Sequence, residues 1–268
     1  MTPVFTLQQG HVPLLISMPH IGTYIPPDLL DSLVPRALDV EDTDWHLHRL
    51  YNFADELGAS VLVPNTSRYV IDLNRPPDDA PMYPGASNTE LCPTRFFTGE
   101  PLYHLGAEPD LTERERRRAT YWQPYHAALQ VELQRLKALH GYALLWDAHS
   151  IRSEIPWLFE GCLPDLSIGT ANGASADAAI TDAVMQVCTD HPAVTAVANG
   201  RFKGGYITRH YGRPDSDLHA IQLEMCQNLY MQETAPYAYI PERAASIQPI
   251  LMKMVASALR ACANCYDK

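Results

Sequence analysis

Histidine and carboxylate side chains stand at the ends of three apolar segments of this chain, and open α/β sheets gather their ligand sites at such strand ends. The first segment ends in His20, the second in Asp147 and His149, and the third in Glu224. A further carboxylate, Asp44, lies at the start of an expected helix. Two histidines and a carboxylate from separate segments form a three-ligand site with one open coordination position, as a catalytic Zn²⁺ requires. His20, Asp44 and His149 are therefore the candidate metal ligands.

The two remaining carboxylates of this group have different expected roles. Glu224, close to the metal but not bound to it, would act as the base for a water molecule. Asp147 precedes His149 by two residues, so both project from the same face of an extended segment and Asp147 can hold the imidazole in place. Each of these residues alone is more often structural. Their joint occurrence at strand ends favours a catalytic site.

Positively charged residues form a second candidate group. Arg75 follows Asn74, and a guanidinium fork beside an amide donor suits a bound carboxylate. The segment 204–213 combines glycines with Arg209 and His210, which suits a loop that approaches a ligand closely. A surface hairpin is the alternative interpretation of that segment.

The elements that must position these residues alternate between strand and helix patterns, which indicates an α/β layered fold with a mostly parallel sheet. We find neither an internal repeat nor a linker that would divide the chain into two domains, so residues 1–268 are expected to form one domain. Strands are expected at 12–18, 59–63, 67–73, 142–146, 193–198 and 220–225, and helices at 44–57, 111–140, 174–189 and 242–262.

Three local signals refine this outline. Thr43 is expected to cap the first helix, and the pair Thr112–Glu115 to form a capping box at the start of the second. The arginines of 114–118 are expected on a solvated helix face. Between these helices, the stretch 76–110 is rich in proline and has few periodic apolar residues, so we expect it to be a loop that covers the site.

Composition excludes several classes of protein. The chain has 268 residues, of which 46% are hydrophobic, so it can bury a full core and is not disordered. Its net charge of −11 argues against a nucleic-acid partner. An anionic ligand therefore needs a local cluster of arginines. No apolar stretch approaches the roughly 18 residues of a membrane helix, so no membrane partner is expected.

The six cysteines and the N-terminus point to one cellular location. The cysteines are scattered, and no positively charged residue precedes the apolar run near the N-terminus as in an export signal. We therefore expect reduced thiols and a cytoplasmic protein. Cys262 and Cys265 have C-x-x-C spacing without a second pair, and the end of a terminal helix explains them better than a zinc site.

Several motifs, taken in order, resemble the N-formylglutamate amidohydrolase (N-formylglutamate deformylase) family. The resemblance extends from about Pro13 to Met231 and includes the long run S-R-Y-V-I-D-L-N-R that ends at Arg75. The other matching segments are S-M-P-H-x-G at 17–22, D-T-D-W-H at 42–46, D-A-H-S at 147–150, G-G-Y at 204–206 with R-H-Y-G at 209–212, and Q-L-E at 222–224 with Tyr230 and Met231.

This resemblance implies a fold and a reaction. The family is similar to the zinc-dependent exopeptidases, so it implies a three-layer α/β/α sandwich of the phosphorylase/hydrolase-like type. The reaction would be the hydrolysis of N-formyl-L-glutamate to formate and L-glutamate in histidine degradation, with Zn²⁺ or another divalent metal as cofactor. The D-L-N-R segment also resembles aspartoacylase-type enzymes, in which the Asn–Arg pair holds the substrate carboxylate.

Residue by residue, the resemblance implies roles for the positions already singled out. His20, Asp44 and His149 match the metal ligands and Glu224 matches the general base. The carboxylate ligand is not unique, because Glu41 and Asp42 lie beside Asp44, which we prefer since it begins the expected helix. The residues implied to bind the substrate, an anionic N-acyl amino acid, are Arg68, Asn74, Arg75, Gly205, Arg209 and His210.

Two other functions fit the same residues. One is a related zinc amidohydrolase that acts on another N-acyl amino acid or on a peptidoglycan amide, and the second substrate is disfavoured without an export signal. The other is a non-catalytic protein that binds a metal or an acyl amino acid. A buried base such as Glu224 argues against it, because a binding protein has no need of one.

Overall fold

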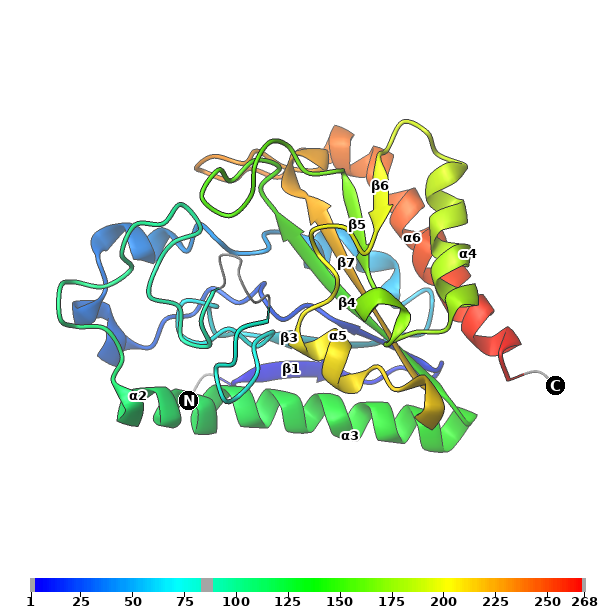
Figure 1. The fold of residues 1–268 in the computed structure, drawn as a ribbon, viewed down its shortest axis with the longest axis horizontal. Coiled ribbons are helices and arrows are strands. Elements are labelled where there is room, and N and C mark those ends of the chain that lie inside the picture. Colours follow the sequence, from blue (N-terminus) through cyan, green and yellow to red (C-terminus); the bar gives the residue numbers. More distant parts are fainter. Residues whose placement is uncertain (1–2, 83–88, 267–268) are drawn as a thin grey trace.

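Seven strands of the described residues form one mixed sheet, in the order β1-β3-β2-β4-β7-β5-β6 (Figure 1). The structure is a computed structural model, which describes residues 3–82 and 89–266. Neighbours β3, β2, β4 and β7 are parallel, as are β5 and β6, whereas β1 and β5 pair antiparallel with β3 and β7. The strands are β1 Phe5–Gln8, β2 Leu14–Ser17, β3 Ser60–Pro64, β4 Ala143–Ile151, β5 Leu166–Gly169, β6 Ala196–Ala198 and β7 Leu218–Cys226.

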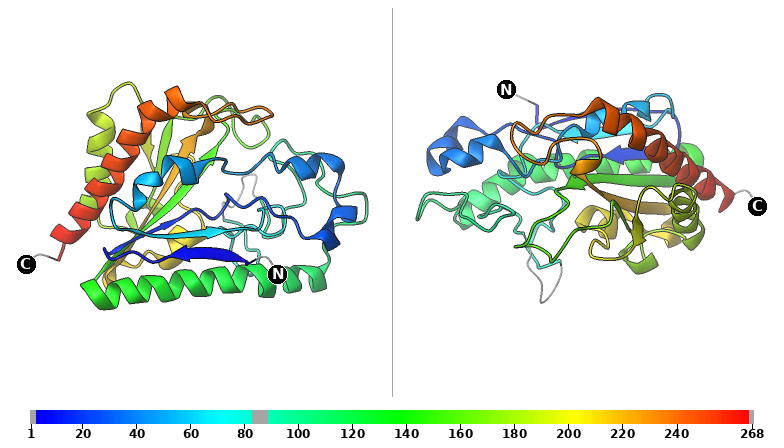
Figure 2. Two further views of the ribbon diagram at one scale, coloured as in Figure 1. Left: turned by 180° about the vertical axis from the view of Figure 1, so that it is seen from behind. Right: turned by 90° about the horizontal axis from the view of Figure 1, so that it is seen from above.

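Helices cover both faces of the sheet, which confirms the expected α/β architecture of three layers. One apolar cluster joins a sheet face to α1, α4 and α6, and a second joins the other face to α3 and α5. In Figures 1 and 2, α4 and α6 lie side by side and α3 runs along the length of the molecule. The helices are α1 Leu47–Leu50, α2 Leu111–Arg117, α3 Gln123–His140, α4 Ala178–Thr189, α5 Tyr206–Tyr211 and α6 Pro241–Asn264.

The three strands that carry the candidate residues are adjacent and parallel at the centre of the sheet. Strands β2 and β4 are buried along their whole length, because helices pack on both faces of the sheet, and this explains the apolar runs at 14–16 and 143–146. Since β2, β4 and β7 run in the same direction, the residues at their carboxyl ends meet at one edge. In the register of β4 and β7, His149 lies opposite Glu224.

Two predicted elements near the site are wrong. Residues 44–57 form no continuous helix: α1 has a single turn, and His46 before it adopts a left-handed φ of 63°. Thr43 donates its hydroxyl to the carbonyl of Val40 instead of capping a helix. Residues 67–73 form buried turns rather than a strand. The hydroxyl of Ser67 accepts from the amide of Tyr69, and an ion pair between Arg68 and Asp72 closes the turn.

The long helical region differs from expectation in its cap and its arginines. Asp110, not the Thr112–Glu115 box, caps α2 by accepting from the amide of Glu113 at 2.8 Å. A π-helical turn separates α2 from α3 just before Pro124. Arg117 is only 1% exposed and donates to the hydroxyl of Tyr103 and the carbonyl of Val70, so the expected solvated arginine face is wrong at this position.

Several short elements differ as well. Strands β1 and β5 carry too few alternating residues to be recognised, and the expected loop or hairpin at 204–213 contains α5. Strand β4 extends through Asp147 and His149 rather than ending before them. The residues of 76–82 and 89–110 form neither helix nor named strand, and residues 83–88 of that expected loop lie outside the described residues. None of the helices in the described ranges is long and apolar enough to cross a membrane.

Candidate active site

His20 lies in the turn that follows β2, with its imidazole buried. Its Nε2 is 2.7 Å from Oδ1 of Asp72, which fixes the ring and leaves Nδ1 facing the other candidate ligands. This Nδ1 atom is 3.2 Å from Nδ1 of His149 and 3.7 Å from Oδ2 of Asp44. The carbonyl of His20 also accepts from the amide of Asp44 at 3.0 Å, which ties the two segments together.

His149 is held in the same way from the opposite side. Its Nε2 is 3.1 Å from Oδ2 of Asp147, and its Nδ1 is 3.2 Å from Oδ2 of Asp44. The spacing of two residues along β4 places Asp147 and His149 on one face, as the sequence predicts. Burial disfavours a charged imidazole, but Asp147 and Asp44 outweigh it and raise the pKa of His149 well above its ordinary value.

Asp44 comes from the loop between β2 and α1 and completes the group. Its Oδ2 accepts from the amide of Ser150 at 3.2 Å, so the carboxylate is anchored to β4. Burial acts to raise the pKa of Asp44, but the hydrogen bonds with His149 and His20 prevail and lower it.

Glu41 and Asp42, the alternative carboxylate ligands, form hydrogen bonds with residues outside the triad. Arg36 holds Glu41 through two hydrogen bonds of 2.7 Å. Asp42 accepts from Tyr69 at 2.8 Å and from Arg152 at 2.9 Å. Asp44 is therefore the carboxylate that faces the two histidines.

The three side chains fit a divalent metal ion. One donor atom from each of His20, Asp44 and His149 lies within 4.8 Å of the others, and all three residues are buried. The second ring nitrogen of each histidine contacts a carboxylate, the arrangement that orients metal-binding histidines. Asp147 Oδ1 is also buried without a hydrogen-bond partner among the described residues. A cation held by His20, Asp44 and His149 would offset the negative charge of the buried carboxylates Asp44, Asp72 and Asp147.

Glu224 stands beside this triad on the neighbouring strand. It retains some exposure, and it lines the pocket together with His149. Burial raises the pKa of Glu224 to about 8, with His149 acting to lower it and Asp44 to raise it further. A carboxyl with such a pKa exchanges protons near neutral pH, which suits a general base and acid.

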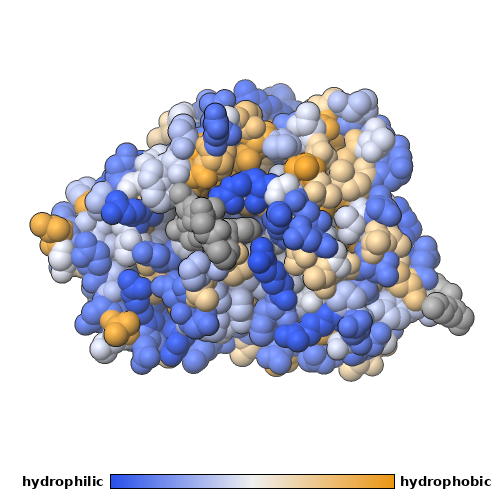
Figure 3. Space-filling view, in the orientation of Figure 1, coloured by the Kyte–Doolittle hydropathy of each residue, from blue (hydrophilic) through white to orange (hydrophobic). Residues whose placement is uncertain are grey.

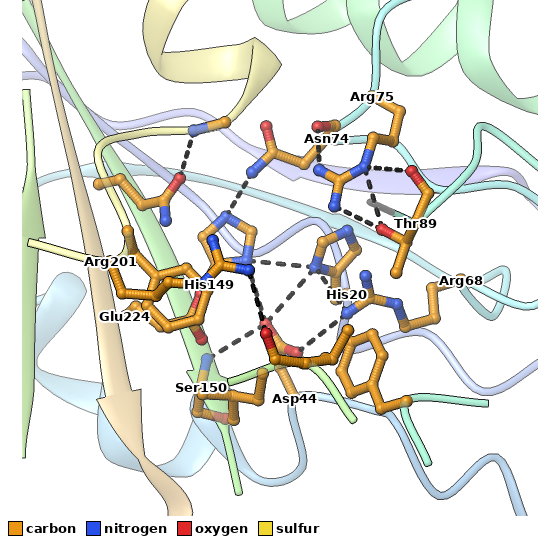
Figure 4. A pocket seen from close by; sticks show the side chains of 16 residues that line it. His20, Asp44, Arg68, Asn74, Arg75, Thr89, His149, Ser150, Arg201 and Glu224 are labelled. Carbon is orange, nitrogen blue, oxygen red and sulfur yellow. Dashed lines mark hydrogen bonds and ion pairs between the residues drawn. The ribbon is translucent and has the colours of Figure 1, made fainter. Parts of the chain in front are cut away.

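A pocket at this edge of the sheet contains the triad, Glu224 and three arginines (Figure 4). Its lining joins charged groups to aliphatic and aromatic side chains, and Figure 3 shows hydrophilic and hydrophobic residues side by side near the centre of one face. The lining residues are His20, Asp44, Arg68, Asn74, Arg75, Thr89, Phe97, His149, Ser150, Ile151, Leu158, Arg201, Phe202, Gly205, Gln222 and Glu224.

Residues 12–231 match the model of a family described as N-formylglutamate amidohydrolase. The chain is 49% identical to an N-formylglutamate deformylase of Pseudomonas putida over the full length of both. It is 51% identical to an N-formylglutamate deformylase of Pseudomonas aeruginosa over 97% of each chain. The chain belongs to the N-formylglutamate amidohydrolase family.

The fold agrees with that placement. A crystal structure of an N-formylglutamate amidohydrolase from Ralstonia eutropha superposes with a TM-score of 0.80 and 24% identity, covering 97% of each chain. A protein of Agrobacterium tumefaciens superposes with a TM-score of 0.72 and 18% identity over 96% of this chain and 95% of that one. The family match and the two relatives about half identical to this chain confirm the family resemblance drawn from the sequence motifs.

Four of the six expected substrate-binding residues of this family member line the pocket. Arg68 pairs with Asp72 at 2.6 Å, and Arg75 donates to the carbonyl and hydroxyl of Thr89. Asn74 contacts Nε2 of His149 at 2.9 Å. Gly205 packs so closely on Asn74 that an added Cβ would lie 2.4 Å from its amide nitrogen, which explains the glycine.

The other two expected substrate-binding residues lie elsewhere. Arg209 and His210 are on α5 and are not among the described residues that line the pocket. Arg209 donates to the carbonyl of Gly204, and His210 stacks on Tyr206 with ring centroids 4.8 Å apart. Both residues lie in the last turn of α5, whereas the pocket is lined by Gly205 in the loop that precedes the helix.

Asp72, Gln222 and Arg201 line or support the site although the sequence analysis did not select them. Asp72 lies within 67–73, which the sequence analysis expected to be a strand, and nothing in that strand pattern marked Asp72 as a residue of the site. Gln222 precedes Glu224 by two residues and accepts from the amide of Gly205 at 2.6 Å, so strand periodicity could have identified it. No motif or spacing to another candidate residue set Arg201 apart from the other arginines of the sequence.

Asp72 is expected to act as a positioning residue for His20. Burial acts to raise the pKa of Asp72, but the nearby His20 and Arg68 help to hold it well below its ordinary value, so the side chain is a carboxylate. The substitution Asp72→Asn removes this negative charge from beside His20. With zinc as the probe metal, we expect the affinity of the site to fall by about 10- to 100-fold, the usual effect of losing such a partner. Titration against a competing chelator measures it.

Asp42→Asn is the matched control, because Asp42 is a neighbouring buried carboxylate that contacts neither histidine through a hydrogen bond among those described. Its zinc affinity should equal that of the wild type, while thermal unfolding checks that both variants fold. Equal losses of zinc affinity in the two variants would contradict a specific role for Asp72.

Proposed function

We propose that this protein is a zinc-dependent amidohydrolase that cleaves N-formyl-L-glutamate to formate and L-glutamate. The observation that carries the proposal is the convergence of a metal-binding triad, a candidate base and arginines in one pocket. Amide hydrolysis needs a base beside the metal, and an anionic substrate needs the arginines. Two relatives about half identical to this chain bear the name N-formylglutamate deformylase, which supports the substrate.

Zinc is the proposed metal, held by His20, Asp44 and His149. Two imidazoles and one carboxylate are ligands typical of catalytic zinc sites with an open position. When bound, the metal would polarise the formyl oxygen and lower the pKa of a nearby water.

Glu224 is the proposed general base and acid. Its carboxylate takes a proton from the attacking water as the new C–O bond forms at the formyl carbon. The same proton passes to the amide nitrogen as the C–N bond breaks, so water and N-formylglutamate yield formate and glutamate. The position of Glu224 opposite His149 in the β4–β7 register supports this role, because it places the base beside a proposed metal ligand.

Arg75 and Asn74 are proposed to orient the substrate, and residues 76–110 to cover it. Asn74 lies against His149, and the side chain of Arg75 is fixed by Thr89. Thr89 and Phe97, both from 76–110, line the pocket, which supports a covering role. Fixed donors of this kind lower the barrier by holding the substrate in a reactive orientation.

We also propose that residues 1–268 form a single domain, as the sequence analysis expects.

A substrate panel separates this reaction from its alternatives. The purified, zinc-loaded protein should release formate and glutamate in equal amounts from N-formylglutamate. N-acetylaspartate should be hydrolysed with a kcat/KM lower by at least about 100-fold, because its acyl group is larger and its side chain shorter. Formate dehydrogenase coupling and amino-acid analysis measure the products. Preferred hydrolysis of N-acetylaspartate would favour an aspartoacylase-like enzyme, and binding without product would favour a binding protein.

A further inference from the structure

Three arginines line the pocket, and the first of them already neutralises the metal site. The guanidinium of Arg68 is buried, with Nη2 2.6 Å from Asp72 Oδ2 and Nη1 3.9 Å from Asp44 Oδ1. It also lies 4.5 Å from the centre of the Phe97 ring. Two carboxylates and an aromatic face thus surround Arg68, so a substrate carboxylate would have to compete with them for its charge.

The second arginine, Arg75, stands on the polar side of the pocket next to the triad. Its Nε donates to the carbonyl of Thr89 at 2.9 Å, and its Nη1 to the carbonyl of Asn74 at 3.0 Å. These neutral acceptors fix the guanidinium without cancelling its charge. Asn74 in turn touches His149, so Arg75 lies one residue from a contact of the metal triad. In N-formylglutamate the α-carboxylate is attached to the carbon that bears the scissile amide nitrogen, and Arg75 is suitably placed for it.

The third arginine, Arg201, stands among apolar side chains. It lies between β6 and α5, and its Nη2 donates to the carbonyl of Leu158 at 3.4 Å. The adjacent Phe202 ring has its centre 5.6 Å from the guanidinium carbon. Phe202 and Leu158 pack on a cluster that includes Phe97 and Ile151, and all four of these apolar residues line the pocket. In the view of Figure 4, Arg75 lies beside Asn74 and Thr89, whereas Arg201 is drawn beside His149 and Glu224.

The placement of Arg75 near the triad and of Arg201 among apolar side chains matches the α-carboxylate and the side chain of a glutamate. Contact with an apolar wall stabilises the two methylene groups of the side chain by removing them from water. A planar guanidinium with two parallel donors stabilises the carboxylate beyond them. We propose that Arg201 binds the side-chain carboxylate of the substrate and so determines selectivity for a dicarboxylic N-formyl amino acid. The inference rests on the proposed function and adds to it the residue that distinguishes glutamate from neutral side chains.

Paired substrates test the assignment. N-formylglutamine has the shape of N-formylglutamate without its side-chain charge, whereas 4-formamidobutanoate keeps that carboxylate and lacks the α-carboxylate. In Arg201→Gln, kcat/KM for N-formylglutamate should fall by about 100-fold or more, as expected when one partner of a charge pair is lost. The value for N-formylglutamine should change by less than about threefold, because that substrate has no charge to lose. Arg201→Lys should recover part of the lost selectivity.

Arg75→Gln gives the complementary result. It should lower kcat/KM strongly for N-formylglutamate and N-formylglutamine alike, and much less for 4-formamidobutanoate. Lys203→Gln is the charge-matched control: Lys203 belongs to the same segment but is not among the described residues lining the pocket, so both selectivities should be retained. Equal losses for N-formylglutamate and N-formylglutamine in Arg201→Gln would overturn the assignment.

The proposed function and the role of Arg201 fail in different ways. If the wild-type protein releases no formate from N-formylglutamate, the proposed function is wrong. Calorimetric titration with L-glutamate and L-glutamine then tests Arg201 independently of turnover. Selective weakening of L-glutamate binding in Arg201→Gln supports the assignment, and equal binding of L-glutamate by the wild type and Arg201→Gln overturns it.

Discussion

Glu224→Gln is expected to lower kcat for formate release by about 100- to 10,000-fold, the range that general acid–base catalysis contributes. Glutamine preserves the size of the side chain and its place opposite His149 on β7, but it cannot accept the proton of the attacking water. Since Glu224 is not one of the three triad residues, the variant should bind metal as the wild type does. Loss of turnover with retained metal is therefore the expected signature.

Stopped-flow or coupled formate assays, together with metal analysis of the same sample, measure both parts of this result. Glu233→Gln is a suitable control, because Glu233 contacts Ser153 beyond the end of β7 and is not among the described residues lining the pocket. The control should turn over at the rate of the wild type. Normal turnover by Glu224→Gln would remove Glu224 from the role of base, and loss of metal would assign it to the ligand set.

His149→Ala should reduce both bound metal and activity to below about 1% of the wild type, since two ligands do not make a catalytic zinc site. The variant also leaves Asp44 and Asp147 without the imidazole between them, so their mutual repulsion should lower the free energy of unfolding. Metal analysis, formate assay and thermal unfolding follow the three effects.

His104→Ala provides the comparison for His149→Ala. His104 is exposed and lies far along the chain from any triad residue, so its removal tests the loss of a histidine as such. Metal content, activity and thermal stability should all match the wild type. A His149→Ala variant that behaved in the same way would contradict the assignment of His149 as a ligand.

The apolar strands and their polar ends are the parts of this site that the sequence predicted best. Apolar runs mark β2 and the first half of β4, and β7 is mostly apolar, because both faces of the sheet are covered; parallel neighbours bring their carboxyl ends together. His20, His149 and Glu224 follow from that rule. The spacing of Asp147 and His149 likewise follows from strand geometry.

The loops were predicted less well, because their conformation depends on distant contacts. Asp44 was selected as the start of a helix, yet a hydrogen bond to the carbonyl of His20 and another from Ser150 place it, and neither is visible in local periodicity. The apolar residues of 67–73 resemble a strand, but the buried Arg68–Asp72 pair closes them into turns. This pair is buried by residues distant in the sequence, and the cost of removing both charges from water depends on that surrounding fold, so local periodicity does not show it.

The arginines illustrate the same limit at the level of function. The sequence placed Arg209 near the ligand because it follows a pair of glycines, whereas α5 directs its Nε to the carbonyl of Gly204. Arg201 precedes the same glycines without a recognisable motif and lines the pocket. Which of the two arginines faces the pocket depends on how α5 and the loop before it pack in the fold, and no local sequence pattern shows this.

The most direct test of the proposed reaction is a zinc titration of the metal-depleted wild-type protein, with formate release from N-formylglutamate as the readout. The His20–Asp44–His149 site predicts no more than background activity without metal, a linear rise as zinc is added, and a plateau at one equivalent per chain. Full activity in the metal-depleted protein, or no formate release at any zinc concentration, would contradict it.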